Sequence, residues 1–272
     1  MGSIVFSAST SHAPHITGFP DLASPDKKAR FYGAMQEVGR RLAAARPDVV
    51  VVVSSDHFHN LFIDRMPAFC VGLADRHQGP AEKWIRIDPF EVRGCREFAR
   101  ALVDHAFESG LDPAFSERIV LEHGVAVPLS FLTPGFDVPV VPVLQNCMVP
   151  PLPSLRRCFE FGALVRATAA KSSLRVAVIG TGGLSHAPGA PEAGQIDSDF
   201  DREFLAMLAS PEPTDVLSIP NERIDRAGFG TWEVRQWATA LGASGGAPAE
   251  VLSYDPIEEW ETGCAAAIFR LA

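Results

Sequence analysis

Three histidines in this sequence follow short apolar runs of the kind that form buried strands. His12, His57 and His186 each come a few residues after such a run, and His57 follows five consecutive valines at 49–53. The carboxyl ends of parallel strands meet at one edge of a sheet, so we expect these side chains to converge there. Neutral imidazoles bind zinc, copper, iron and nickel. The pattern therefore predicts a metal site at the strand ends.

A carboxylate would complete a two-histidine, one-carboxylate site, which leaves coordination positions open for substrate. Asp56 and Glu122 each directly precede a histidine, so on an extended segment they would point to the opposite side. Asp56 suits a backbone cap or a second layer around the site. Glu233 lies in the first turn of a predicted helix at 231–241. A carboxylate in the first turn is also stabilised by the helix dipole without any metal. Glu233 can therefore be interpreted as a metal ligand or as a structural carboxylate, and both interpretations stay open.

The remaining histidines divide into three groups. His123 lies beside Gly124 in a predicted loop and could act as an acid or a base. His77 and His105 are interpreted as structural residues. His15 and His59 stay undecided, because each neighbours a stronger candidate.

Helical and strand-like segments alternate along the chain, which is typical of an α/β protein. Helices are predicted at 26–45, 90–109, 155–170, 199–208 and 231–241, and strands at 4–8, 49–53, 68–73, 138–144, 175–179, 251–254 and 267–271. Pro139 and Pro142 favour an edge or irregular position for their strand. No linker or repeat divides the sequence. We therefore expect one domain over residues 1–272, with a central mixed sheet flanked by helices.

The net charge of −9 and the pI near 5.4 argue against nucleic acid or an anionic membrane surface as the main partner. The five cysteines are odd in number and form no C-x-x-C pair, which disfavours a zinc finger or a disulfide framework. No signal-like segment or membrane-length apolar run is found. These features predict a cytoplasmic protein that spans no membrane.

Two further features have weaker interpretations. The loop GTGGLSH at 180–186 lacks the spacing and the lysine of phosphate-binding motifs, so it is a weak phosphate signal. Arg226 and Arg235 could pair with a substrate carboxylate. An ordinary solvated helix face is the preferred reading for both.

Five ordered motifs give the chain a resemblance to a known family. They are SHAPH, SSDHFHNLFIDRMPAFCVG, LEHGVAVPLSFL, GTGGLSHAP and TWEVRQWATALGA, and a later piece, YDPIEEW, extends the match. The chain resembles the LigB-type class III extradiol ring-cleavage dioxygenases. The resemblance implies that His12, His57 and Glu233 bind Fe(II). It also implies that His123 and His186 are acid/base residues.

This resemblance implies an enzyme that inserts O2 into a catechol-like ring next to the diol, with a small aromatic substrate and O2 as partners. Substituted catechols, gallate-type rings, aminophenols and hydroxypyridones all stay open, and a homo-oligomer is expected. Only 44 residues separate His186 from Thr231, which looks shorter than in relatives and leaves the substrate open. A zinc-dependent hydrolase and a non-catalytic metal-binding protein are the alternatives.

Overall fold

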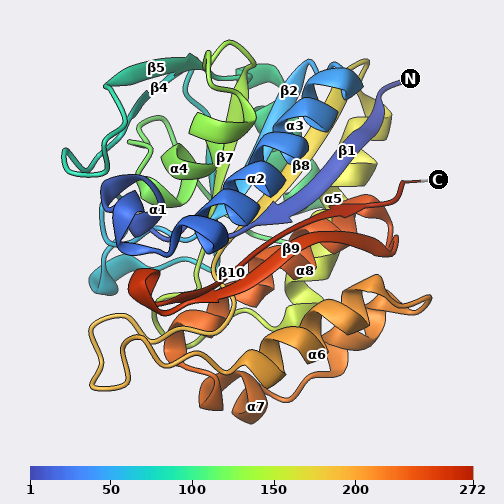
Figure 1. Cartoon of the computed structure of the whole chain (residues 1–272). Helices are drawn as coiled ribbons and strands as arrows, with labels where there is room; N and C mark the ends of the chain where they lie inside the picture. The colour runs from blue at the N-terminus through green and yellow to red at the C-terminus, as the bar shows by residue number, and fades with distance from the viewer. Residues whose placement is uncertain (272) are drawn as a thin grey trace.

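The computed structural model describes residues 1–271, which form one large sheet with helices on both faces (Figure 1). The strands of the chain are β1 (Ser3–Thr10), β2 (Val49–Ser54), β3 (Phe69–Gly72), β4 (Arg76–Gly79), β5 (Phe90–Arg93), β6 (Ala114–Ser116), β7 (Val140–Gln145), β8 (Arg175–Thr181), β9 (Ala249–Ile257) and β10 (Thr262–Phe269). The helices are α1 (His15–Gly18), α2 (Pro25–Ala45), α3 (Arg96–Glu108), α4 (His123–Leu132), α5 (Leu155–Lys171), α6 (Ser198–Ala209), α7 (Asn221–Arg226) and α8 (Val234–Ser244).

The eight-stranded sheet is mixed, in the order β6-β3-β7-β2-β8-β1-β10-β9. Its four central strands, β7, β2, β8 and β1, are parallel. The strands β3, β10 and β9 each run antiparallel to a neighbour. A separate two-stranded sheet joins β4 and β5. The predicted α/β class with a mixed sheet is confirmed, and the carboxyl ends of β1, β2 and β8 share one edge.

The valines of β2 divide the core into two layers. Val49, Val51 and Val53 pack with residues of α3, α5 and α8, whereas Val50 and Val52 pack with residues of α2 and α4. All five are fully buried. Burial of a valine side chain stabilises the fold by roughly 1.5–3 kcal/mol relative to exposure, so the register of β2 is strongly fixed. Because the register of β2 is fixed, the position of the backbone at His57, three residues beyond this strand, is fixed as well.

Two predicted elements differ from the structure. The segment 90–109 is not one helix, because residues 90–93 form β5 and the helix begins at Arg96. The strand containing Pro142 is not at an edge, since β7 lies between β3 and β2. The β3 ladder covers only Val143–Gln145, so Pro142 lies just outside it and its missing N–H costs no bond there.

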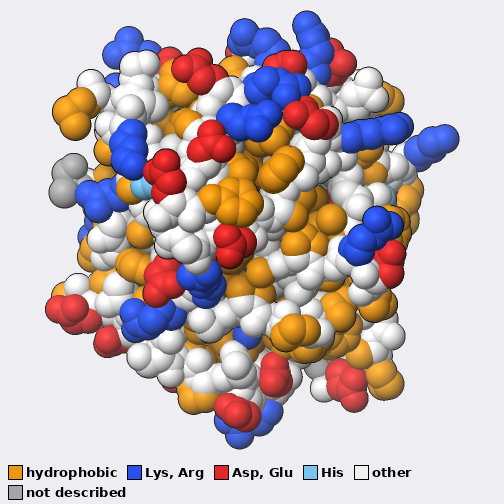
Figure 2. Space-filling view, turned by 180° about the vertical axis from the view of Figure 1, so that it is seen from behind, with side chains coloured by type: hydrophobic (Ala, Val, Ile, Leu, Met, Phe, Trp, Pro, Cys, Tyr) orange, Lys and Arg blue, Asp and Glu red, His pale blue; other side chains and the backbone are white. Residues whose placement is uncertain are grey.

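Charged side chains of both signs lie side by side on the face shown in Figure 2. Among residues 1–271, no helix combines the length and apolar character needed to cross a lipid bilayer.

Candidate active site

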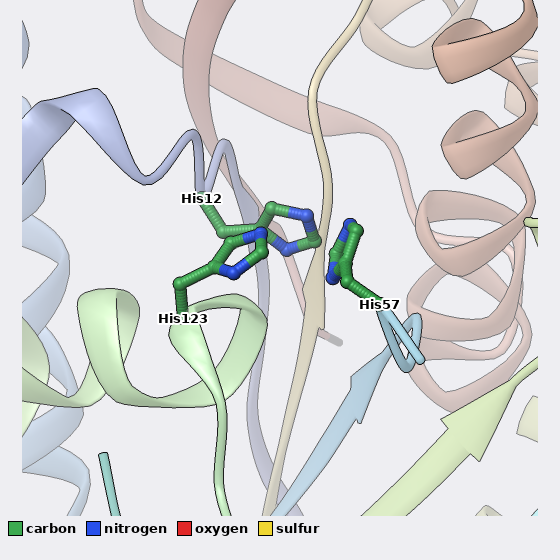
Figure 3. Close-up of side chains that lie close together, drawn as sticks. All are labelled: His12, His57 and His123. Atoms are coloured by element: carbon green, nitrogen blue, oxygen red, sulfur yellow. The ribbon is translucent and has the colours of Figure 1, made fainter. Parts of the chain in front are cut away.

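Three imidazole rings meet at the carboxyl edge of the sheet (Figure 3). His12 follows β1, His57 follows β2 and His123 begins α4. The ring centroids of His57 and His123 are 4.1 Å apart, and that of His12 lies 5.3 Å from His57 and 5.6 Å from His123. One nitrogen of each ring lies within 4.8 Å of the others, which suits a shared metal ion.

A hydrogen-bond chain fixes the tautomer of His12. The Thr181 hydroxyl donates to the Gly124 carbonyl over 2.8 Å, so it can only accept from His12 Nδ1, at 3.0 Å. The proton of neutral His12 therefore lies on Nδ1, and Nε2 presents a lone pair to the site.

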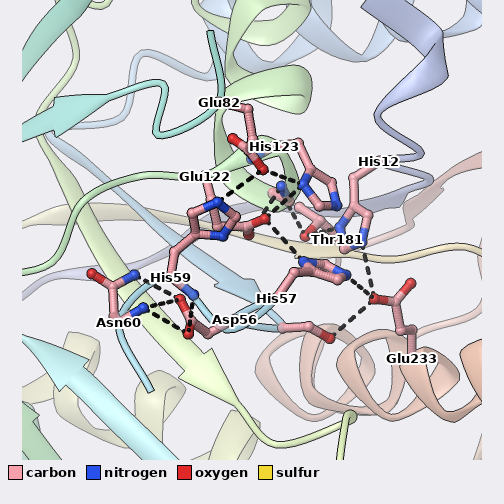
Figure 4. A network of polar contacts seen from close by, with 12 residues as sticks. His12, Asp56, His57, His59, Asn60, Glu82, Glu122, His123, Thr181 and Glu233 are labelled. Atoms are coloured by element: carbon pink, nitrogen blue, oxygen red, sulfur yellow. Dashed lines mark hydrogen bonds and ion pairs between the residues drawn. The ribbon is translucent and has the colours of Figure 1, made fainter. Parts of the chain in front are cut away.

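Carboxylates fix the tautomers of His57 and His123 in the same way (Figure 4). Glu122 Oε2 accepts from His57 Nδ1 at 2.9 Å and lies 2.8 Å from His123 Nδ1. Glu82 also accepts from His123 Nδ1, and it accepts from the His123 backbone N–H. Because both Nδ1 atoms face carboxylates, Nδ1 carries the proton of each neutral ring and Nε2 carries the lone pair. Histidine ligands are commonly oriented by such outer carboxylates.

Glu233 faces the two strand-end histidines. Its Oε1 lies 3.0 Å from His12 Nε2 and 3.3 Å from His57 Nε2. Ser55 Oγ donates to the same oxygen at 3.0 Å, and the Gly183 N–H donates to Oε2 at 2.7 Å. Contrary to prediction, Glu233 closes a 3-10 turn, Phe229–Glu233, and α8 begins one residue later.

His186 occupies the opposite side of Glu233, with its Nε2 3.7 Å from Glu233 Oε2. Its Nδ1–H donates to the Leu184 carbonyl at 2.8 Å, so Nε2 carries the lone pair here too. Gly230 lies against the imidazole ring, and a Cβ at that position would overlap it. Gly228 has φ +107° and lies against the His186 backbone, a conformation that favours glycine. The turn before Glu233 thus packs on His186.

The environments of these groups shift their pKa values in different directions. Burial raises the pKa of Glu233, but His12, His57 and His186 outweigh burial and hold that pKa well below its ordinary value. Burial lowers the pKa of His123, but Glu122 outweighs it and the pKa is raised. Burial lowers the pKa of His186. The two histidines outside the His12–His57–Glu233 set therefore differ, with His123 favouring its charged form and His186 its neutral form.

Burial and neighbouring charges also act in opposite directions on the pKa values of His57 and Glu122. Burial lowers the pKa of His57, but Glu122 and Glu233 outweigh it and raise the pKa well above its ordinary value. Burial raises the pKa of Glu122, but His123 and His57 hold it well below its ordinary range. Glu122 and Glu233 are therefore ionised, and positive charge is favoured on His57 and His123.

A buried carboxylate holds the backbone next to His186. Asp201, on α6, accepts from the Ser185 N–H and from Ser185 Oγ, both at 2.8 Å. Tyr254 donates its hydroxyl proton to Asp201 at 2.9 Å. The Asp201 side chain is fully buried, and burial raises its pKa to about 6. These bonds tie the loop that bears His186 to α6 and β9.

The pKa of Asp201 predicts a pH-dependent stability. Between about pH 4 and 6, folded Asp201 keeps a proton that the unfolded chain has released, so the free energy of unfolding falls as pH rises through this window. The change is about 3 kcal/mol, from roughly two pKa units at 1.36 kcal/mol each. Denaturation of wild type and Asp201→Asn from pH 4 to 7 should show their stability difference moving by that amount. Asp199→Asn, exposed on the same helix, is the control. A stability difference between wild type and Asp201→Asn that does not change with pH would contradict the raised pKa of Asp201.

The other predicted residues lie as follows. Asp56 is a backbone cap, as expected, and accepts from the N–H groups of His59, Asn60 and Leu61. His59 lies at the rim, with Nε2 3.8 Å from Glu82. It forms a second group of candidate donors with Glu82 and Glu122, whose carboxylates already bind His57 and His123. His15 lines the pocket.

Four expectations outside the site have mixed outcomes. His105 is structural, with Nδ1 2.9 Å from Thr168 Oγ1. His77 is buried away from the site, and neither ring nitrogen makes a hydrogen bond of good geometry, although the Ile119 backbone lies near enough to act on its pKa. The solvated reading of Arg235 is wrong: it is buried and donates to the Pro153 carbonyl and to Asn221. Arg226 lines a separate cavity.

His123 does not lie in a loop, because it is the first residue of α4. Pro128 lies inside that helix. Glu122 is the helix cap and accepts from the Gly124 N–H at 3.0 Å. Four polar residues had no signal in the sequence, since only the fold brings them to the site, where they bind a histidine, Glu233 or the loop that bears His186. They are Ser55, Glu82, Thr181 and Asp201.

The converging side chains line a pocket of about 160 Å³. Its walls comprise His12, Ala13, Pro14, His15, His57, His123, Gly183, His186, Pro188, Glu233, Trp260, Glu261 and Thr262. A larger cavity of about 520 Å³ lies beyond Ala187, but its lining has no histidine. The chemistry is therefore concentrated in the smaller pocket, which has the size for a single ring.

Comparison with known proteins identifies one family, two relatives and one solved structure. The family described as "Catalytic LigB subunit of aromatic ring-opening dioxygenase" matches residues 7–265. The 2,3-dihydroxyphenylpropionate/2,3-dihydroxicinnamic acid 1,2-dioxygenase 2 of Dechloromonas aromatica is 31% identical and covers 93% of this chain and 94% of its own. The corresponding 1,2-dioxygenase of Paraburkholderia phymatum is 32% identical, with 93% of each chain covered.

The alignment with the Dechloromonas protein spans 303 positions, more than the 272 residues of this chain, so that relative has insertions that this chain lacks. Among solved structures, an uncharacterized protein of Escherichia coli K12 superimposes with a TM-score of 0.62 at 16% identity. It covers 88% of this chain and 92% of its own, and it supports the fold alone.

Proposed function

The chain belongs to the LigB family of aromatic ring-opening dioxygenases and is a ring-cleavage dioxygenase, and from this we propose that it holds Fe(II) with His12, His57 and Glu233. We propose further that it opens a catechol-like ring beside the diol, in the catabolism of aromatic compounds. Family membership implies a metal cofactor, and the identity of that metal is part of the proposal.

The contacts of Glu233 are the main support for the ligand set. With Nδ1 of both histidines protonated, two Nε2 lone pairs and a carboxylate oxygen face one another at 3.0–3.3 Å. Three such groups repel unless a proton or a cation lies between them. Two imidazoles and one carboxylate are the donors of the non-haem Fe(II) oxygenases. The residues present therefore fit the metal.

When bound, Fe(II) supplies open positions for the two oxygens of a diol and for O2, and its charge lowers the pKa of a bound hydroxyl group. The chain's own residues fix where that diol lies. His12 and His57 are held by Thr181 and Glu122, so their Nε2 atoms cannot turn away. The apolar walls from Ala13 and Trp260 exclude water around the ring.

His186 and His123 are assigned to proton transfer. The Leu184 carbonyl holds the proton of His186 on Nδ1, so Nε2 can accept a proton from the second hydroxyl of the diol. Two carboxylates face Nδ1 of His123 and stabilise its positive charge, so it can donate a proton as the ring opens. Neutral His186 is thus the base and charged His123 the acid.

Oxygen uptake tests this function. The protein would be purified without air, loaded with Fe(II) or with Zn(II), and offered catechols, gallate-type rings, aminophenols and hydroxypyridones. We expect iron-dependent uptake of one O2 for each ring opened, with a product that contains both oxygen atoms. Turnover with zinc and no oxygen consumed would contradict the proposal and favour a hydrolase. No turnover of any ring with Fe(II) bound would contradict the catalytic assignment.

Two further properties are also proposed. The five cysteines are free thiols, four of them buried, which suits a reducing cytoplasm. We propose a cytoplasmic homo-oligomer, and size-exclusion chromatography with light scattering measures the assembly.

A further inference from the structure

Half of the residues that line the pocket outside the five metal and proton-transfer residues are apolar. These apolar residues are Ala13, Pro14, Pro188 and Trp260. The Trp260 indole is fixed in place, because its Nε1–H donates to the Phe19 carbonyl at 3.2 Å. The cavity of about 160 Å³ is smaller than sites for drug-sized ligands, which measure roughly 300–1,000 Å³. A diol ring therefore fits inside, and a larger ring substituent must leave through the mouth.

The charges of the wall disfavour an anionic substituent. None of the lining residues is lysine or arginine, and Arg235 is committed to Pro153 and Asn221. The only other ionisable members are His15 and Glu261. Within residues 1–271, the Glu261 side chain has no hydrogen bond or ion pair. Outside the metal and proton-transfer residues, this wall offers a substrate carboxylate no lysine or arginine, and Glu261 would repel it.

An aromatic shelf continues the pocket outward, formed by His15, Phe19 and Trp84. His15 lines the pocket, and its ring lies 5.8 Å from Phe19 and 6.4 Å from Trp84 between centroids. Phe19 and Trp84 stack at 5.6 Å and are 44% and 46% exposed. Trp84 packs on Gly18, where a Cβ would come within 2.6 Å of the indole. The shelf is therefore in place before substrate arrives.

We propose that this enzyme acts on catechols whose ring substituent is uncharged and apolar, with Glu261 rejecting anionic substituents and the aromatic shelf binding the substituent. The proposal rests on the proposed function and narrows its substrate class. It separates this chain from the relatives named for 2,3-dihydroxyphenylpropionate, a substrate that carries a carboxylate. Beyond the metal and proton-transfer residues, the pocket wall has no lysine or arginine to pair with that carboxylate.

Two catechols of similar size isolate the charge. Using Fe(II)-loaded enzyme, kcat/KM would be measured for 3-propylcatechol and 2,3-dihydroxyphenylpropionate, and Kd without oxygen by tryptophan fluorescence. We expect wild type to favour 3-propylcatechol by about tenfold or more, a difference of roughly 1.4 kcal/mol. Glu261→Gln should reduce this preference and Glu261→Lys should reverse it. Glu259→Gln, exposed in the same segment, should preserve it.

The shelf is tested by the ratio of two Kd values. Trp84→Ala should raise Kd for 3-phenylcatechol about 3- to 10-fold more than Kd for catechol, as expected for loss of one aromatic contact. Phe19→Leu should act in the same direction without disturbing the loop that bears Trp84. Phe107→Ala, exposed on α3, is the control and should leave the ratio unchanged.

The outcomes separate this inference from the function itself. A preference for 2,3-dihydroxyphenylpropionate, or a ratio unaffected by Glu261→Gln, would overturn the substrate class and leave the dioxygenase assignment intact. Equal Kd ratios in wild type, Trp84→Ala and Phe19→Leu would overturn the role of the shelf. If neither catechol binds or is opened by enzyme with Fe(II) bound, the proposed function fails and this inference with it.

Discussion

Replacing Glu233 with glutamine is expected to abolish oxygen uptake and to weaken Fe(II) binding by more than about 100-fold, since loss of groups that only orient a ligand already costs 10–100-fold. Glutamine keeps the shape of the side chain but removes the charge that faces His12 and His57. Equilibrium dialysis without air, with metal analysis, measures the affinity. Glu160→Gln, half-exposed on α5, should match wild type in both affinity and uptake.

The same measurement decides between two donor sets. His123 also brings a ring nitrogen close to His12 and His57, so three histidines could hold the ion instead. His123→Gln should keep the metal and lose turnover if Glu233 is the third ligand. The opposite result, with metal retained by Glu233→Gln and lost by His123→Gln, would assign the three-histidine set and make Glu233 an outer group.

Replacing His186 with phenylalanine is expected to slow turnover about 100- to 10,000-fold while Fe(II) binding stays at the wild-type level, because the change removes the proposed proton acceptor and none of the proposed metal ligands. The His186 ring lies against Gly230, and phenylalanine also places a planar ring at this position. Steady-state oxygen uptake gives kcat, and substrate binding without oxygen gives Kd. We expect the loss to appear in kcat rather than in Kd.

The control for this variant is the same histidine-to-phenylalanine substitution at His105, outside the pocket. His105 binds Thr168 far from the pocket, so His105→Phe should leave turnover per folded molecule unchanged. Full activity of His186→Phe would refute its role as the base. Loss of metal in that variant would place His186 in the ligand set.

The sequence predicted the elements whose patterns are local. The valine run defined β2, and the apolar periodicity of 26–45 defined α2. It also predicted that His12, His57 and His186 would converge, because strand ends in a parallel sheet share one edge. Proline misled at one position, because Pro142 is tolerated inside the sheet just beyond the end of the ladder between β7 and β3.

The outer layer of the site could not be predicted, because it depends on tertiary contacts. Glu82 lies 41 residues before His123 on a loop without periodicity, yet it binds that ring directly. Nothing in the sequence distinguishes Thr181 from other threonines at strand ends. In the structure its hydroxyl group donates to the Gly124 carbonyl and therefore accepts from His12 Nδ1. The sequence left two interpretations of Glu233 open, a metal ligand and a carboxylate that only faces the helix dipole. Only the distances from Glu233 to His12 and His57 favour the ligand.

One loop, between β4 and β5, carries both Glu82 and Trp84. Glu82 binds His123, and Trp84 completes the aromatic shelf with His15 and Phe19. A mutation that reshapes this loop to admit a new substituent is expected also to shift Glu82, the partner of His123, which is the proposed proton donor. The two proposals together therefore predict that substrate range and turnover number change together in variants of this loop. Variants selected for a new substrate should first pass through slow enzymes and recover speed by second changes near Glu82.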